Sequence, residues 1–162
     1  MSTGKEGIRL IIIQNGQLVS TQGLTKADLA IEDGRIAAIA EHIEPGENDT
    51  VQDAEGCYVF PGFIDGHTHL DMDSGVTVTA DDFTTGTRAA VCGGTTTLVD
   101  FATQDKGDTL MHALEAWHKK AQGKSSCNYA FHMAITDWNE AVKAEIPQMF
   151  EQGVTSFKAY MA

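Results

Sequence analysis

The pattern of apolar and polar residues before residue 57 differs from the pattern after it. In the first part, short alternating runs are separated by Asn15-Gly16 and Asp33-Gly34, which are typical of tight hairpin turns. The expected strands cover residues 8–13, 18–19, 27–31 and 35–40. The pattern predicts a small antiparallel β unit over residues 1–56, incomplete because strands this short need further strands to cover an apolar face.

From residue 57 to 162, strand-like runs alternate with the periodicity of amphipathic helices. The expected strands are 58–64, 95–101, 128–135 and 154–160, and the expected helices begin near 81, 108 and 137. Asp108 is a suitable cap for the second helix, and Pro147 should break or restart the third. Four consecutive strand and helix units predict parallel strands with right-handed crossovers.

Two α/β architectures satisfy this order: an open doubly wound sheet, or part of a (β/α)8 barrel. Neither GxGxxG nor GxxxxGK[ST] occurs in the sequence, so the nucleotide-binding versions of the open sheet lose their main support. A whole barrel takes about 250 residues, and the 162 residues given are too few for one.

Composition narrows the class of partner. Lys and Arg number 11 and Asp and Glu number 23, so the net charge of −12 disfavours nucleic acid. No apolar run is long enough to cross a bilayer, and the first seven residues lack a signal-peptide pattern, which predicts a cytoplasmic protein that does not bind membranes. The three cysteines form no CxxC pair and are expected to be buried free thiols.

Candidate chemistry begins with His67 and His69, which end the expected strand at 58–64. Residues at i and i+2 of an extended segment point to the same side, so both imidazoles can bind one metal. Asp65 could orient them as a supporting carboxylate. A coincidental or purely structural pair is the alternative.

Lys158 is the second candidate, because it lies inside the last expected strand between Phe157 and Ala159. Burial and nearby cations would lower the pKa of its amine, and a neutral amine can react with carbon dioxide. The resulting carbamate is an anion with two oxygens, which can bridge two divalent metals. A lysine whose charged end simply reaches solvent is the alternative.

These stretches resemble the cyclic amidohydrolases of the amidohydrolase superfamily, most closely the dihydropyrimidinase and hydantoinase group. The similar segments are Pro61 to Leu70, Cys92 to Phe101 and Gly153 to Lys158. The resemblance implies the first half of a metal-dependent (β/α)8 barrel over residues 57–162, preceded by part of a small antiparallel β-sandwich over residues 1–56. It also implies that His67, His69 and Lys158, as N6-carboxylysine, bind two divalent metal ions, most often zinc.

The same resemblance implies ring-amide hydrolysis of cyclic ureides, such as dihydropyrimidines or 5-substituted hydantoins, to N-carbamoyl amino acids by a homotetramer. The family's general-base aspartate and remaining ligands would lie beyond residue 162, and its substrate-contacting tyrosine would fall at position 163. The 162 residues alone are therefore expected to be inactive and poorly stable. An allantoinase, or a non-catalytic scaffold of the dihydropyrimidinase-related kind, is the alternative.

The substrate is expected to meet Leu70, Asp71 and Met72, with Tyr160 lining the pocket. For Asp71 and Asp73 the alternative is a pair of solvated loop carboxylates. Dihydroorotases, related enzymes, usually carry an arginine where this chain has Asp71, so a neutral ring is favoured over a carboxylate. Three further residue groups complete the candidates. His132 is expected to be hydrogen-bonded rather than a ligand, and residues 104–108 to form a pocket rim. Asp100, at the end of the second strand, is expected to be structural first, and support of the site without contact to the metal is the alternative.

Overall fold

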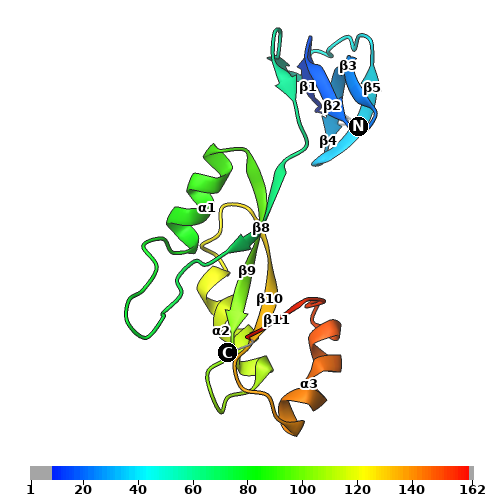
Figure 1. The fold of residues 1–162 in the computed structure, drawn as a ribbon. Helices are drawn as coiled ribbons and strands as arrows, with labels where there is room; N and C mark the ends of the chain where they lie inside the picture. The colour runs from blue at the N-terminus through cyan, green and yellow to red at the C-terminus, as the bar shows by residue number, and fades with distance from the viewer. Residues whose placement is uncertain (1–8, 161–162) are drawn as a thin grey trace, which may run out of the picture. The chain divides into compact units, whose positions relative to one another are not determined.

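The computed structural model describes residues 9–160 and divides them into two compact units (Figure 1). The first unit ends at Pro61 and the second begins at Gly62, a few residues after the boundary expected at 56 and 57. The expected strand at 8–13 includes one residue outside the described part of the chain. The first seven residues, for which no signal-peptide pattern is expected, also lie outside the described part of the chain, as do residues 161 and 162.

The first unit consists of two β-sheets. One has the strand order β5-β4-β1-β6 and the other β3-β2-β7. The strands are β1 (Ile11–Gln14), β2 (Gln17–Ser20), β3 (Gly23–Lys26), β4 (Asp28–Glu32), β5 (Arg35–Ala40), β6 (Thr50–Asp53) and β7 (Tyr58–Val59). β6 and β7 pair in parallel with β1 and β2, so the expectation of a purely antiparallel unit is wrong for these two strands.

The two turn signals of this unit have different outcomes. Asp33 and Gly34 both have positive φ and join β4 to β5 as an antiparallel hairpin, which confirms that prediction. Asn15-Gly16 joins β1 to β2, which belong to different sheets, so the hairpin expected there is wrong. The Asn15 backbone N–H donates to the buried Asp28 carboxylate at 2.9 Å, and this contact directs the chain from one sheet to the other.

The second unit is a four-stranded parallel sheet with the order β11-β10-β9-β8 and three helices. Its elements are β8 (Phe63–Thr68), α1 (Phe83–Cys92), β9 (Thr95–Thr103), α2 (Leu110–Ala121), β10 (Asn128–Ile135), α3 (Glu140–Glu151) and β11 (Phe157–Ala159). The bounds of β10 are those predicted. The run at 58–64 is divided at Pro61-Gly62 between β7 and β8, and β8 is an exposed edge strand rather than a buried one.

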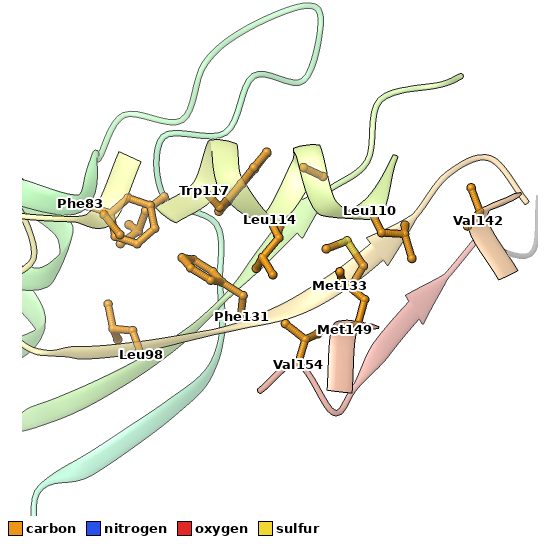
Figure 2. Close-up of a cluster of buried hydrophobic side chains, with 14 residues drawn as sticks. Phe83, Leu98, Leu110, Leu114, Trp117, Phe131, Met133, Val142, Met149 and Val154 are labelled. Carbon is orange, nitrogen blue, oxygen red and sulfur yellow. The ribbon is translucent and has the colours of Figure 1, made fainter. Parts of the chain in front are cut away.

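Helices α1 and α2 pack against β9 and β10 to form the hydrophobic core, which Figure 2 shows. The predicted apolar stripe of α2 is buried, which confirms it. Its members are Leu110, Leu114, Trp117 and Ala121. In α1 the side chains of Phe83 and Thr87 are completely buried, and Phe83 contacts the rings of Tyr129 and Phe131 edge-on.

The starts of α2 and α3 and the effect of Pro147 differ from the expectations. Thr109 and Asn139 are the N-caps of α2 and α3, one and two residues after the caps expected at Asp108 and Asp137. Pro147 lies inside α3 and does not break it. Val142 and Met149 are buried in the hydrophobic core on the two sides of the proline, and this packing holds both halves of α3 in place despite the lost backbone hydrogen bond.

All four strands of the parallel sheet end at the same edge, because parallel strands share one direction. Pairing places Thr68 beside Asp100, Phe101 beside His132 and Ala134 beside Lys158. The expected chemical groups therefore come from neighbouring strands. No helix within residues 9–160 has the length and apolar character needed to cross a membrane.

Candidate metal centre

His67 and His69 lie at the carboxyl end of β8, where pairing with β9 becomes irregular. The register shifts between Asp65 and Thr68, so the backbone at Gly66 and His67 leaves the regular ladder. Irregularities of this kind change the direction of side chains next to functional sites. The two imidazole ring centroids are 5.1 Å apart, close enough for one ion to contact both rings.

The buried Phe101 ring at the end of β9 contacts all three side chains that the sequence singles out as metal ligands. Its centroid lies 4.6 Å from that of His67 and 4.9 Å from that of His69, which stacks on it. The Lys158 Nζ lies 4.6 Å from the same centroid. Two separate segments of the chain, the end of β8 and β11, thus deliver two imidazoles and one amine to a single apolar surface on β9.

Lys158 is half-buried in β11, and its amine contacts two aromatic rings. Its Nζ lies 5.5 Å from the Tyr160 ring centroid in addition to the Phe101 contact. Among residues 9–160, none of the ion pairs involves Lys158. Ring faces stabilise a cation less than a carboxylate does.

The His69 imidazole favours its neutral form, the form that binds metals. Burial lowers its pKa below the ordinary 6.5, the Lys158 ammonium lowers it further, and the Asp100 carboxylate acts in the opposite sense. The buried His69 Nδ1 has no hydrogen-bond partner within the described part of the chain. A buried nitrogen with unused bonding capacity fits a ligand-binding ring.

The donor set fits a metal only if Lys158 is modified. Across residues 9–160, no three His, Cys, Asp or Glu side chains come together in a way that could hold an ion. Two imidazoles are present, and a protonated lysine is not a ligand. A carbamate on Lys158 would supply the missing anionic oxygens beside His67 and His69.

A hollow of about 520 Å³ opens beside these groups. It is lined by Gly66, His67, Phe101, His132, Ser156, Phe157, Lys158 and Ala159. Within its wall, the His132 Nε2 lies 3.0 Å from the Gly66 carbonyl, and since a carbonyl only accepts, this nitrogen carries the proton. The other ring nitrogen, Nδ1, is hydrogen-bonded to the Ser156 hydroxyl. With both nitrogens engaged, His132 is hydrogen-bonded, as the sequence analysis expects.

The remaining predicted site residues divide into two groups. Asp65 is exposed and its carboxylate accepts from the His67 backbone N–H at 3.1 Å, so it contacts the backbone of a histidine rather than its ring. Leu70 is buried in the hydrophobic core and is not among the side chains that line the two hollows of this edge. Leu70 therefore packs in the core here, and its contact with a substrate stays a prediction.

Met72 and Tyr160 line a second hollow, of about 480 Å³, together with residues of the loops that follow β8 and β9. The expected pocket rim contributes Gln104, Asp105 and Lys106 to it. Asp71 is half-buried with a φ of 51°, and its carbonyl accepts from the Lys120 Nζ at 2.6 Å. Asp71 thus shapes the loop through its backbone.

Phe101 and Ser156 are the site residues that sequence reasoning missed. A phenylalanine in a strand is normally counted as core, and a serine carries no metal-binding signal. Only the pairing register of β8, β9, β10 and β11 reveals that Phe101 lies between the two histidines and Lys158.

Comparisons with known proteins agree on one family. The model of the amidohydrolase family matches residues 58–160. The D-hydantoinase of Geobacillus stearothermophilus is 49% identical over 152 residues, which are 93% of this chain and 32% of the relative. Two solved structures cover 94% of this chain and 33% of their own: a D-hydantoinase with a TM-score of 0.90 and 49% identity, and the Brevibacillus agri dihydropyrimidinase with 0.90 and 42%.

The chain thus spans about a third of the length of the relatives that it matches. Within that third, both sheets of the first unit and the parallel sheet of the second have counterparts in a D-hydantoinase.

Proposed function

The chain belongs to the amidohydrolase family, and on that basis we propose that the complete protein hydrolyses the ring amide bond of cyclic ureides. The products would be N-carbamoyl amino acids. The relatives' names, D-hydantoinase, D-phenylhydantoinase and dihydropyrimidinase, support 5-substituted hydantoins and dihydropyrimidines as the substrate class.

One observation carries the proposal: His67, His69 and Lys158 meet on the Phe101 ring at the carboxyl edge of a parallel sheet. Parallel α/β folds build their active sites at this edge. Each histidine and the lysine alone has an ordinary structural explanation. Their convergence from β8 and β11 is what those explanations do not account for.

His67, His69 and a carbamate on Lys158 would hold two divalent metal ions, most often zinc. When bound, such ions supply Lewis acidity toward the ring carbonyl and lower the pKa of water. The lowering of the His69 pKa by burial and the unpartnered Nδ1 of its ring support this role. The general-base aspartate that the family implies would come from outside residues 1–162.

The chain's own residues contribute orientation and shielding. The buried Phe101 ring excludes water from one side of the site and strengthens the electrostatic interactions there. His132 holds the Gly66 carbonyl and the Ser156 hydroxyl, so it links the irregular end of β8 to the segment before Lys158. Fixed positions of this kind lower the cost of organising a reaction site.

The local charge supports a neutral substrate. Asp71 and Asp73 lie two and four residues after the second histidine, and Asp73 lines the second hollow. Two carboxylates at this point would repel a substrate that carries its own carboxylate. A neutral hydantoin or dihydropyrimidine ring avoids that repulsion.

The test uses the complete protein that carries this sequence. Metal content is measured, and hydrolysis of dihydrouracil, hydantoin and allantoin is compared for the wild type, His67→Ala and Lys158→Ala. We expect divalent metal in the wild type and a loss of kcat/KM of at least about a hundredfold in both variants, because several kcal/mol of transition-state stabilisation disappear.

His112→Ala is the matched control, since it removes an exposed imidazole on α2 and should leave hydrolysis unchanged. A metal-free wild type, or unchanged hydrolysis in His67→Ala and Lys158→Ala, would contradict the proposal. Preference for allantoin would indicate the allantoinase alternative. A complete protein with neither metal nor hydrolysis would support the non-catalytic scaffold.

A further inference from the structure

Asp100 has an unusual position for a carboxylate, because it is completely buried at the end of β9. A buried charge is costly unless hydrogen bonds replace its lost water. One carboxylate oxygen, Oδ2, accepts from the Leu70 backbone N–H at 2.7 Å and the Thr68 hydroxyl at 3.0 Å. The other, Oδ1, accepts from the Phe101 N–H at 2.7 Å and the Trp117 indole N–H at 3.2 Å.

The two groups held by Oδ2 belong to the residues on either side of His69. Thr68 is the last residue of β8, and Leu70 is the first residue whose side chain enters the core. A single oxygen thus fixes the backbone before and after the imidazole, where regular pairing with β9 has ended. Without these bonds, nothing in the β ladder would set the direction of the His69 ring.

Helix α2 continues this support one residue further. The Lys120 Nζ lies 4.0 Å from the centroid of the Trp117 ring and donates to the Asp71 carbonyl at 2.6 Å. Trp117 is the same residue whose indole N–H reaches Asp100. The segment from Thr68 to Asp71 is therefore held by a connected set of side chains from β9 and α2.

We infer that Asp100 is a positioning residue for the metal centre, which fixes the His69 imidazole by binding the residues on both sides of it. The inference rests on the proposed function, because a position matters only if His69 binds an ion. Groups that orient a ligand without touching the metal typically change its affinity by about 10- to 100-fold when removed. A carboxylate that served folding alone would leave the affinity unchanged.

The experiment measures Co²⁺ binding to the metal-free complete protein, by competition with a chelator and by the visible absorption bands of the bound ion. Asp100→Asn keeps the size of the side chain but replaces one carboxylate oxygen with an amide NH₂ group. That group is a donor, and it would face N–H or O–H groups that are themselves donors. We expect Co²⁺ affinity to fall about 10- to 100-fold with altered absorption bands.

Thr87→Val is the matched control. Thr87 is also completely buried in the second unit, and its hydroxyl accepts from the Ser126 N–H at 2.9 Å, far along the chain from the β8 end. Its loss should lower the melting temperature and leave the Co²⁺ affinity and spectrum unchanged. This separates general destabilisation from an effect on the metal centre.

The outcomes distinguish the two claims. A wild type that does not bind Co²⁺ overturns the proposed function and, with it, this inference. If the wild type binds Co²⁺ and Asp100→Asn binds it with the same affinity and the same spectrum, the inference alone is overturned. If Asp100→Asn does not fold, Thr68→Val and Trp117→Phe each remove one donor to Asp100, and we expect smaller losses of affinity; identical Co²⁺ binding in both overturns the inference.

Discussion

Each unit of the molecule contains one buried aspartate that joins segments far apart in the sequence. In the first unit, Asp28 is 3% exposed and accepts from the backbone N–H groups of Asn15 and Ile43, both at 2.9 Å, and from His42 at 3.1 Å. In the second unit, Asp100 accepts from the residues around His69 and from Trp117. The two carboxylates solve the same burial problem in the same way.

The difference lies in what each aspartate holds. Asp28 fixes a crossing between two sheets and the segment after β5, and none of the candidate metal ligands is in its unit. Asp100 fixes the segment that carries a candidate ligand. Both carboxylates are buried and hydrogen-bonded, so these two properties do not distinguish the role of Asp28 from that of Asp100. The role of each depends on which residues it orients. Three predictions test this comparison.

The largest effect is expected when residues 1–162 are produced alone: neither unit should melt cooperatively as a monomer, and hydrolysis should be absent. In the first unit Ile36 and Ile39 of β5 are 64% and 57% exposed, and in the second Phe63 and Ile64 of the edge strand β8 are 50% and 69% exposed. Exposed apolar edge strands favour association. Calorimetry with sedimentation measures this.

The complete protein under the same conditions is the control. A cooperative monomeric transition, or measurable hydrolysis by the 162 residues, would contradict the prediction. Limited proteolysis of residues 1–162 would also show which unit stays folded longer. It would therefore show whether Asp28 or Asp100 can hold its segments when the rest of the protein is absent.

The second effect separates packing from positioning in the second unit. Phe83→Ala in the complete protein should lower the free energy of unfolding by about 3–5 kcal/mol, because a completely buried aromatic side chain leaves a cavity. Denaturant titration measures the loss. Co²⁺ affinity of the folded variant should stay at the wild-type level, since Phe83 contacts Tyr129 and Phe131 rather than the histidines. A parallel loss of affinity would show that core packing, not Asp100, determines the position of His69.

The smallest effect is expected in the first unit. Asp28→Asn in the complete protein should lower the melting temperature by several degrees at neutral pH, because backbone N–H groups of Asn15 and Ile43 lose a charged acceptor. Co²⁺ affinity should be unchanged, in contrast to Asp100→Asn. A weakened metal affinity in Asp28→Asn would remove the distinction between the two aspartates.

The pH dependence of this variant has a fixed sign. Hydrogen bonds from the Asn15 and Ile43 backbone hold the pKa of Asp28 below its ordinary 3.8, and burial opposes them only in part. The stabilisation is therefore present above the unfolded pKa and is lost as the pH falls through the lower, folded pKa. The difference in melting temperature between the wild type and Asp28→Asn should shrink on acidification below about pH 4. A difference that grows there would contradict this assignment.

Local sequence signals predicted secondary-structure elements well where the signals agreed with one another. β10, β5 and the hairpin at Asp33-Gly34 have the expected bounds, because alternation and turn preference agree there. Pro147 and Asn15-Gly16 failed for a common reason. In both places contacts with distant residues outweigh the local preference: buried neighbours keep α3 continuous, and Asp28 directs β1 into a different sheet from β2.

The sequence alone identifies the candidate ligands, because His67, His69 and Lys158 are residue types that bind metals or can be modified to do so, at a recognisable spacing. It also determined the parallel order of the second unit, since strand and helix periodicity alternate there. Which side chains support the ligands depends on the folded chain. The sequence places Asp100 near the site but favours a structural role for it, and Phe101 carries no local signal, because the supporting role depends on strand register and on hydrogen bonds between residues about thirty positions apart.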